Sequence, residues 1–280
     1  MSKSIRIYIP TRGRMGKARQ STLREFLQYS DHEPILVCPP EEYNAHKRYY
    51  GKVMKCKRVG IGPTRQWILD NSSADVVFMV DDDMRFSYRP KANIPKLERL
   101  TNLNPLVELV LKTVEVDGFI HGGLGSRQGN NYRDFRTHRR GVMTEDGHCV
   151  QDCERANNVH FMNREAVNAQ GVRMDCLKVM EDFHFTLSLL LKGFPNRIIH
   201  DYVWNQEASG KTGGCSLYRT PQIQGEAAEE LAAAFPDFVK VAIKKSKETS
   251  QSWKGFKERK DVNIRWVKAA KAGGIPDAQI

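Results

Sequence analysis

Five consecutive apolar residues, Val76 to Val80, run directly into the three aspartates Asp81, Asp82 and Asp83. The apolar run is too short to span a membrane, and its composition fits a strand buried inside a parallel sheet. In open α/β sheets, ligands bind in the crevice at the carboxyl ends of the strands. An extended chain would point Asp81 and Asp83 to one face and Asp82 to the other. Because crowded carboxylates repel unless a cation lies between them, we predict a hard divalent metal site here, with an acidic strand-to-loop turn as the alternative.

Segments of alternating strand and helix character surround this strand. Before it, we expect strands at 5–9, 34–38 and 53–59 and helices at 17–29, 41–50 and 64–69. This alternation is typical of a parallel, doubly wound sheet. After it, we expect helices at 104–116, 164–169 and 181–191 and strands at 118–121, 159–162 and 197–204. The four glycines between residues 122 and 129 predict a loop whose backbone closely approaches another group.

Membrane and secretory signals are missing from the 280-residue sequence. It has no run of about 18 apolar residues, the minimum for a membrane-spanning helix. Its first residues lack the apolar core of a secretory signal, and its six cysteines are too sparse for a disulfide framework. We therefore expect reduced thiols and a cytoplasmic location, that of an infected host cell if a phage encodes the chain. A zinc site that includes Cys149 and Cys153 is the alternative use of two of these cysteines.

Two further groups of titratable residues lie at the ends of expected elements. Glu181 and Asp182 follow Met180 at the start of a helix, where acids are also favoured by the helix dipole alone. His200 follows an apolar pair at the end of a strand and precedes Asp201. A purely structural role is the alternative for each group.

Taken in order, these features resemble a known class of enzymes. An N-terminal strand ends in Pro10-Thr11-Arg12, and then come the Asp-x-Asp of residues 81–83, the glycine-rich segment, Met-Glu-Asp at 180–182 and a late histidine. The order resembles the GT-A class of nucleotide-sugar glycosyltransferases. In size, charge and motif order the chain is similar to the TET-associated glycosyltransferases of bacteriophages. The resemblance implies an α/β, GT-A-like catalytic domain over residues 1–220 with a mostly parallel, doubly wound central sheet, followed by a helical, lysine-rich extension over residues 221–280.

The resemblance also implies roles for individual residues. Asp83 and Asp81 would bind Mn²⁺ or Mg²⁺ on the donor diphosphate, with Asp83 the more direct ligand and His200 completing the metal site. Asp182, beside Glu181, would be the catalytic base of an inverting enzyme. The nucleotide-sugar pocket would include Pro10, Thr11, Arg12, Arg65, Asp82, Gly123 and Arg127. The donor is expected to be UDP-linked, although Cys38-Pro39-Pro40-Glu41 lacks the aspartate that reads uracil in related enzymes, which leaves the donor base open.

The positive charge of the chain bears on the chemical class of its acceptor. The formal net charge is +11, and residues 239–271 hold eleven basic and three acidic residues with three interleaved aromatics. Basic groups with aromatics suit phosphate contacts and base stacking, whereas an amphipathic helix that packs the aromatics on the core is the alternative. Expected nucleic-acid contacts are Lys244, Lys245, Lys254 and Lys257 in this segment and Arg133, Arg136, Arg139 and Arg140 after the glycines.

The leading hypothesis is sugar transfer to a hydroxymethylated pyrimidine in DNA, which requires the base to be flipped out of a duplex. A GT-A-like enzyme acting on a glycan, lipid-linked or protein acceptor is one alternative. A non-catalytic nucleic-acid-binding protein on this fold is another, and nucleotidyl transfer, which also uses paired aspartates and metal, is a third. The sequence leaves the sugar and the oligomeric state open.

Overall fold

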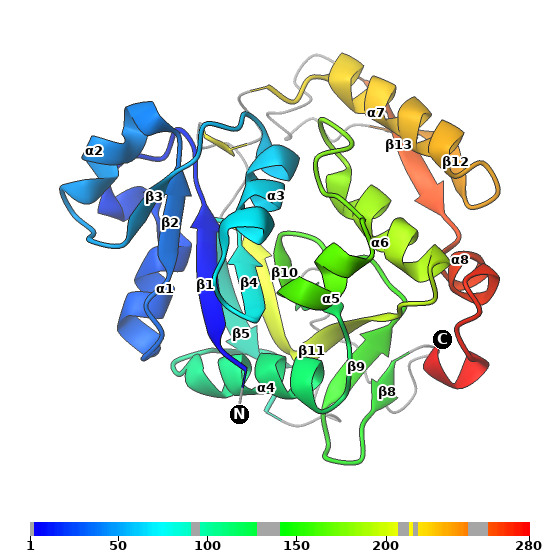
Figure 1. The fold of residues 1–280 in the computed structure, drawn as a ribbon, viewed down its shortest axis with the longest axis horizontal. Coiled ribbons are helices and arrows are strands. Elements are labelled where there is room, and N and C mark those ends of the chain that lie inside the picture. The colour runs from blue at the N-terminus through cyan, green and yellow to red at the C-terminus, as the bar shows by residue number, and fades with distance from the viewer. Residues whose placement is uncertain (1–2, 91–95, 128–140, 207–212, 215–217, 246–256) are drawn as a thin grey trace.

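An eleven-stranded sheet forms the centre of the molecule in the computed structural model, which describes residues 3–90, 96–127, 141–206, 213–214, 218–245 and 257–280 (Figure 1). Its main path runs through β3 (Val53–Lys55), β2 (Ile35–Cys38), β1 (Ile5–Pro10), β4 (Val76–Val80), β10 (Val159–Asn163), β7 (His121–Ser126), β11 (Asn196–Gln206), β5 (Met84–Tyr88) and β6 (Glu98–Arg99). A side branch adds β9 (Cys149–Asp152), which pairs with β11, and β8 (Val142–Met143), which pairs with β9.

Most strands of the main path run in one direction. The pairs β3–β2, β2–β1, β1–β4 and β7–β11 are parallel, whereas β10 is antiparallel to both β4 and β7. The carboxyl ends of β1, β4, β7 and β11 therefore lie at the same edge of the sheet. This arrangement confirms the mostly parallel α/β architecture that the sequence predicts, and it places the aspartates after β4 at that edge.

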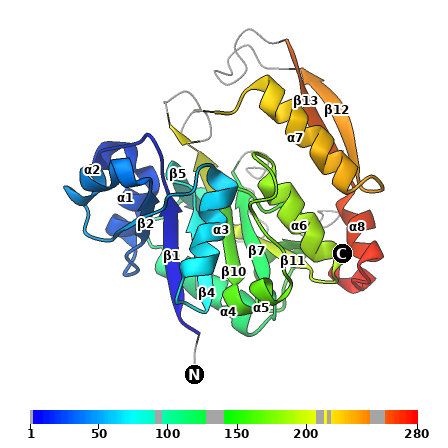
Figure 2. The same cartoon turned by 45° about the horizontal axis from the view of Figure 1, so that its top comes forward.

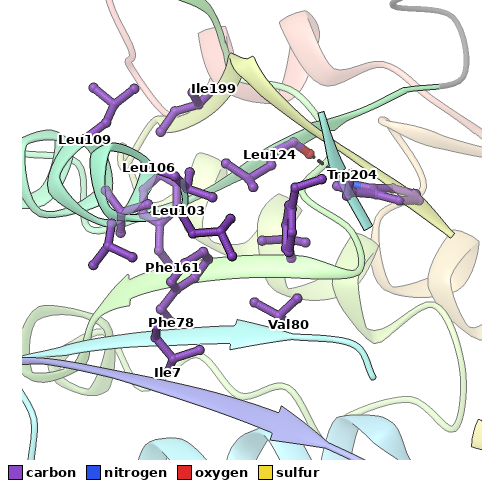
Figure 3. Close-up of a cluster of buried hydrophobic side chains, with 14 of the residues drawn as sticks. Ile7, Phe78, Val80, Leu103, Leu106, Leu109, Leu124, Phe161, Ile199 and Trp204 are labelled. Carbon is purple, nitrogen blue, oxygen red and sulfur yellow. Dashed lines mark hydrogen bonds between the residues drawn. The ribbon is translucent and has the colours of Figure 1, made fainter. Parts of the chain in front are cut away.

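Helices cover both faces of the sheet. They are α1 (Ser21–Tyr29), α2 (Tyr43–Lys47), α3 (Ile61–Asn71), α4 (Asn104–Glu115), α5 (Arg164–Ala169) and α6 (Glu181–Leu191), with short 3₁₀ turns at Lys17–Arg19 and Pro40–Glu42. On one face, Phe78 and Val80 of β4 pack with Leu106 of α4 and Phe161 of β10 (Figure 3). On the other face, β4 packs through Val77 and Met79 against α3, α5 and α6. Burial on both faces explains why every residue of β4 is apolar.

The glycine-rich segment is a strand and not the loop that the sequence predicts. Gly122, Gly123 and Gly125 all lie in β7. A Cβ on Gly122 would lie 2.2 Å from Cζ of Phe161, and one on Gly125 would lie 2.3 Å from Nδ1 of His200. The sequence predicts that the backbone of these glycines closely approaches another group. In the structure that group is the neighbouring side chains and backbone of the protein itself.

Replacing Gly122 with alanine is expected to lower the free energy of unfolding by about 1–3 kcal/mol, because the added methyl group overpacks the core. Gly51 is the matched control, since a Cβ there meets no atom within 4 Å and its φ is not positive. G51A should change stability by less than about 0.5 kcal/mol. The midpoints of urea unfolding measure both values, provided that the slope of unfolding free energy against urea concentration is unchanged. Equal midpoints for the two variants would contradict the packing explanation.

The C-terminal segment is mixed, so the expectation of a helical extension is wrong in part. Helix α7 (Pro221–Ala234) precedes a hairpin of β12 (Val239–Lys245) and β13 (Glu258–Ile264), and α8 (Trp266–Ala272) and a 3₁₀ turn at Asp277–Gln279 follow (Figure 2). Val239, Val241 and Ile243 alternate with other residues along β12, which is the period of a strand. The segment packs on α6 through a shared apolar cluster that includes Leu187, Leu231, Val262 and Trp266.

Two expectations from composition can be compared with the described residues. None of their helices is both long and apolar enough to cross a membrane. Their five cysteines are free thiols, of which only Cys176 is exposed. Cys149 and Cys153, the alternative zinc ligands, are both buried, and Sγ of Cys153 donates to the carbonyl of Gln279.

Candidate active site

The three aspartates lie in the tight connection between β4 and β5, so the alternation of an extended chain does not apply to them. Asp82 and Asp83 both form ion pairs with Arg14, and Nη2 of Arg14 lies 2.8 Å from Oδ2 of Asp83. Asp81 instead receives hydrogen bonds from Arg65 at 2.6 Å and from Nδ2 of Asn158 at 3.1 Å. The expectation that Asp82 points away from Asp83 is therefore wrong, because the chain turns here.

Asp82 is held by the loop that follows β1. The hydroxyl of Thr11 donates to Oδ2 of Asp82 at 2.5 Å, and Gln20 donates to that hydroxyl at 2.8 Å. Burial raises the pKa of Asp82 to about 7, although Arg14 opposes the shift. Thr11, which follows Pro10 at the end of β1, thus lies in the predicted site. Arg12 contributes its carbonyl, which accepts from the amide of Gly214 at 2.8 Å.

Asp83 presents an oxygen that suits a cation. Nε2 of Gln206, at the end of β11, donates to Oδ2 of Asp83 at 3.0 Å. The other oxygen, Oδ1, is buried and accepts no hydrogen bond from the described part of the chain. Burial raises the pKa of this carboxyl group, although Arg14 and Gln206 oppose the shift. An oxygen of this kind is a fitting ligand for Mg²⁺ or Mn²⁺.

Arg65 joins the aspartates to the start of α6. It is 3% exposed, and its guanidinium group binds Oε1 of Glu181 at 2.7 Å as well as Asp81. Burial opposes the charge of Arg65, but Asp81 and Glu181 outweigh this effect and raise the pKa of Arg65. Burial also raises the pKa of Glu181 to about 7. Both predicted residues therefore belong to one buried network beneath the aspartates.

Asp182, the predicted base, has a separate partner. Nε and Nη2 of Arg155 both bind Oδ2 of Asp182, at 2.8 and 2.7 Å. Met180, the N-cap residue of α6, has the left-handed backbone conformation with φ of 64°. This turn starts α6 so that Glu181 and Asp182 fall in its first turn, where the helix dipole favours carboxylates. The two neighbouring acids thus contact different arginines, Glu181 the buried Arg65 and Asp182 the more exposed Arg155.

The balance of charge favours a bound cation. Five carboxylates, those of Asp81, Asp82, Asp83, Glu181 and Asp182, contact three arginines, Arg14, Arg65 and Arg155. When all are ionised, two negative charges are left, which one divalent ion would neutralise. No three His, Cys, Asp or Glu side chains among the described residues gather in a metal-binding group. A metal held here by Asp81 and Asp83 would therefore take its other ligands from water or substrate phosphates, as Mg²⁺ commonly does.

The structure does not bring His200 to the aspartates. In the register of β11 with β5, Gln206 pairs with Met84 and Tyr202 with Tyr88. These four residue steps alone span about 13 Å, and His200 lies beyond them. Its ring instead fills the space beside Gly125. Gln206 and not His200 contacts Asp83 through a hydrogen bond, and the role of His200 as a metal ligand stays a prediction.

The other predicted residues are more scattered. Gly123 lies inside β7, where a Cβ would approach Ala156 to 3.0 Å, and Arg127 follows β7, with its amide donating to the carbonyl of Trp204. Lys244 and Lys245 end β12, and Lys257 immediately precedes β13. Arg133, Arg136, Arg139, Arg140 and Lys254 lie outside the described residues.

Four residues of the site were missed by sequence reasoning: Arg14, Arg155, Asn158 and Gln206. Arg14 carried a signal, because it follows the first strand in a glycine-containing basic loop. Gln206 lies two residues beyond the predicted strand 197–204, at the end of β11. Arg155 and Asn158 lie in an irregular segment of mixed composition, and nothing in their local sequence marks them.

The fold is similar to that of solved nucleotide-sugar enzymes. One is S. aureus TarS 1–349 in complex with UDP-GlcNAc, with a TM-score of 0.51 and 13% identity over 84% of this chain and 67% of that one. Another is the mannosyltransferase PcManGT from Pyrobaculum calidifontis in complex with GDP-Man and Mn²⁺, with a TM-score of 0.51 and 11% identity over 85% of this chain and 65% of that one. The chain spans about two thirds of each of these structures and 40% of a longer TarS structure. At this identity the similarity identifies the GT-A fold.

Sequence comparison identifies the family. No curated protein sequence shows significant similarity to the chain. Residues 5–214, three quarters of the sequence, match the family described as TET-associated glycosyltransferase. The match covers the strands of the central sheet, the aspartates and the start of α6. The chain therefore belongs to the TET-associated glycosyltransferase family and is a glycosyltransferase with a GT-A-like fold.

Proposed function

We propose that the protein transfers a sugar from a nucleotide-diphosphate donor to a hydroxymethylated pyrimidine in DNA, with inversion at the anomeric carbon. The observation that carries the proposal is that the acidic residues of the site fall into two sets, which pair with different arginines. Asp81, Asp82 and Asp83 form an acidic cluster paired with Arg14 and Arg65, whereas Asp182 forms its ion pair with a different arginine, Arg155. A cation-binding group beside an independent base is what sugar transfer to a hydroxyl group requires.

The donor would bind above the aspartates. Related folds bind UDP-GlcNAc in TarS and GDP-Man with Mn²⁺ in PcManGT, which supports a nucleotide sugar here. In this chain Asp83 and Asp81 would hold Mn²⁺ or Mg²⁺. When bound, the ion would offset the negative charge that develops on the diphosphate leaving group. Arg14 reaches the same aspartates from the loop after β1 and would contact the donor phosphates.

Asp182 would act on the acceptor. The hydroxymethyl oxygen attacks the anomeric carbon, the bond from that carbon to the diphosphate breaks, and the hydroxyl proton passes to Asp182. Asp182 is favoured over Glu181 as base because Arg65 draws Glu181 into the buried network. Arg155, the partner of Asp182, lies closer to solvent, with 37% of its side chain exposed.

The C-terminal hairpin supports a polyanionic acceptor. Lys260 of β13 packs against Gly225 and Glu229 of α7, which marks the face covered by that helix. The opposite face carries Lys240, Lys244 and Arg259 with a single acid, Asp261, which binds Lys244 at 3.4 Å and Arg259 at 3.5 Å. This basic face suits the phosphate backbone of DNA.

Transfer of radiolabelled sugar tests the proposed reaction. Purified protein is incubated with UDP-glucose, UDP-GlcNAc or GDP-mannose and with duplex DNA containing either cytosine or hydroxymethylcytosine. We expect label only on the hydroxymethylated DNA and loss of labelling after chelation of divalent metal, restored by Mn²⁺ or Mg²⁺. Labelling of a glycan, lipid-linked or protein acceptor, with none on DNA, would reject the DNA acceptor. Full activity after chelation would reject the metal.

The hairpin makes a separate prediction about DNA affinity. K240Q/K244Q removes two phosphate-binding charges, so the slope of log affinity against log salt should fall by about 1.8. K47Q/K52Q is the charge-matched control at α2 and β3, remote in sequence from the hairpin, and its slope should equal that of the wild type. Fluorescence anisotropy with a labelled duplex measures both. The same slope for both variants would show that the hairpin does not contact phosphate.

A further inference from the structure

Residues 153–158 form an irregular but firmly held connection between β9 and β10, here called the connector. Cys153 and Asn158, at its two ends, have left-handed φ values of 54° and 57°. The amide of Cys153 donates to the carbonyl of Asn196 at 2.9 Å, and Nδ2 of Asn196 donates to the carbonyl of Glu154 at 2.6 Å. Ala156 is fully buried against Gly123. The surrounding contacts therefore fix the connector in a conformation that few residues adopt unaided.

The connector contacts both halves of the candidate site. Asn158 binds Asp81 twice, since its side chain donates to Oδ2 and its carbonyl accepts from the Asp81 amide at 2.9 Å. Three residues earlier, Arg155 binds Asp182. One short segment thus links the proposed donor side to the proposed base.

The geometry at Asp182 is asymmetric. Both Nε and Nη2 of Arg155 bind Oδ2, at 2.8 and 2.7 Å, and Arg155 does not bind Oδ1. Nε donates a hydrogen bond to Oδ2 and Nη2 forms an ion pair with the same oxygen, so the planar guanidinium restrains Oδ2 of Asp182. The second oxygen is left to face another group, as a base must when it receives a proton.

Arg155 is itself held by an aromatic stack. Its guanidinium carbon lies 3.9 Å from the ring centroid of Phe183, the residue after Asp182. The Phe183 ring lies nearly parallel to that of Trp266, with centroids 6.0 Å apart and an interplanar angle of 20°. Trp266 begins α8, beyond residues 5–214 that match the family. Stacking of this kind restrains an arginine that solvent would otherwise leave mobile.

We propose that Arg155 is a positioning residue, which aims Oδ1 of Asp182 at the acceptor hydroxyl and is kept in place by Phe183 and, from the C-terminal segment, Trp266. The proposal rests on the proposed role of Asp182 as base. It assigns the C-terminal segment a part in the reaction that the family match does not include. An exposed surface ion pair would not need two successive aromatic rings to hold its arginine.

Steady-state kinetics of R155Q test the proposal, with hydroxymethylcytosine DNA and the nucleotide sugar that the wild type uses. We expect kcat to fall about 10- to 100-fold, within the range of misplaced catalytic groups, with donor KM within twofold of the wild type. Added guanidinium ion should restore part of kcat. R155K keeps the charge but lacks the planar guanidinium that presents Nε and Nη2 to Oδ2 and stacks on Phe183, so it should remain impaired. R173Q removes an exposed arginine whose Nε and Nη2 bind the two oxygens of Asp175, a surface ion pair away from the candidate site, and it should not change kcat.

The aromatic stack is tested by F183L and W266L. Each should lower kcat without raising donor KM, and W266F, which keeps a ring, should lower it less. In a D182N background R155Q should cause no further loss, because the two residues act as a unit. If D182N is inactive but R155Q keeps kcat within twofold, the positioning role is rejected while the base remains. Normal activity of D182N would instead reject the proposed base itself.

Discussion

Replacing Asp182 with asparagine is expected to lower kcat about 100- to 10,000-fold, the usual contribution of a general base. Asparagine has the same shape and can still accept hydrogen bonds from Arg155, so α6 and its surroundings should be preserved. It cannot take the proton of the acceptor hydroxyl. In the proposed mechanism Asp81, Asp82 and Asp83 at the end of β4 bind the donor, and calorimetric titration with nucleotide sugar should therefore give an unchanged Kd.

Asp175 provides the matched control for this substitution. It also forms a two-fold ion pair with an arginine, Arg173, but that pair is exposed. D175N should keep wild-type kcat and donor affinity. Near-normal turnover by D182N would remove Asp182 as base and direct attention to Glu181. Weak donor binding by D182N would show that its effect spreads beyond the acceptor side.

Replacing Arg65 with methionine is expected to lower the free energy of unfolding by about 3–5 kcal/mol, which would be the largest stability loss considered for this chain. Methionine fills a similar volume but leaves Asp81 and Glu181 without their shared cation. Leaving Glu181 without a partner costs more than leaving Asp81 without one, because the Glu181 side chain is more deeply buried. Burial already raises the pKa of Glu181 to about 7 with Arg65 present. The midpoint of urea unfolding at constant slope measures the loss.

The second variant separates loss of charge pairing from loss of packing. In R65M/E181Q the buried carboxylate is gone, so part of the lost stability should return. R173M, in the exposed Arg173–Asp175 pair, should cost less than about 1 kcal/mol. A cost below about 1 kcal/mol for R65M would mean that water or relaxation satisfies Asp81 and Glu181 without the arginine.

Local pattern was sufficient for the elements that build the sheet. The apolar run of β4, the alternating segments before it and the start of α6 at Glu181 agree with the sequence predictions. Asn163 caps α5, with its side chain accepting from the amide of Ala166. These features depend on residues close together in the chain, which is why periodicity and capping rules identify them.

Features that depend on distant contacts were not predictable in this way. The glycines of β7 resemble a loop in isolation, and only the positions of Phe161, Ala156 and His200 explain why a strand needs them. The lysines of β12 and β13 suggested a solvated helix, although the alternation along Val239–Lys245 was the better signal. Asp82 and Asp83 both form ion pairs with Arg14 because the chain turns between β4 and β5, and the sequence did not predict the geometry of that turn.

The contacts that define the site have a consequence for how the chain folds. Arg65 and Glu181 are 116 residues apart in sequence, Asp81 and Asn158 are 77 apart, and Asp83 and Gln206 are 123 apart. Contacts of such long range close large loops and form slowly, after local helices and hairpins. A growing or refolding chain would therefore acquire its secondary structure well before its carboxylates meet their partners. The carboxylate cluster, costly to assemble from like charges, is completed only when nearly the whole sheet is in place.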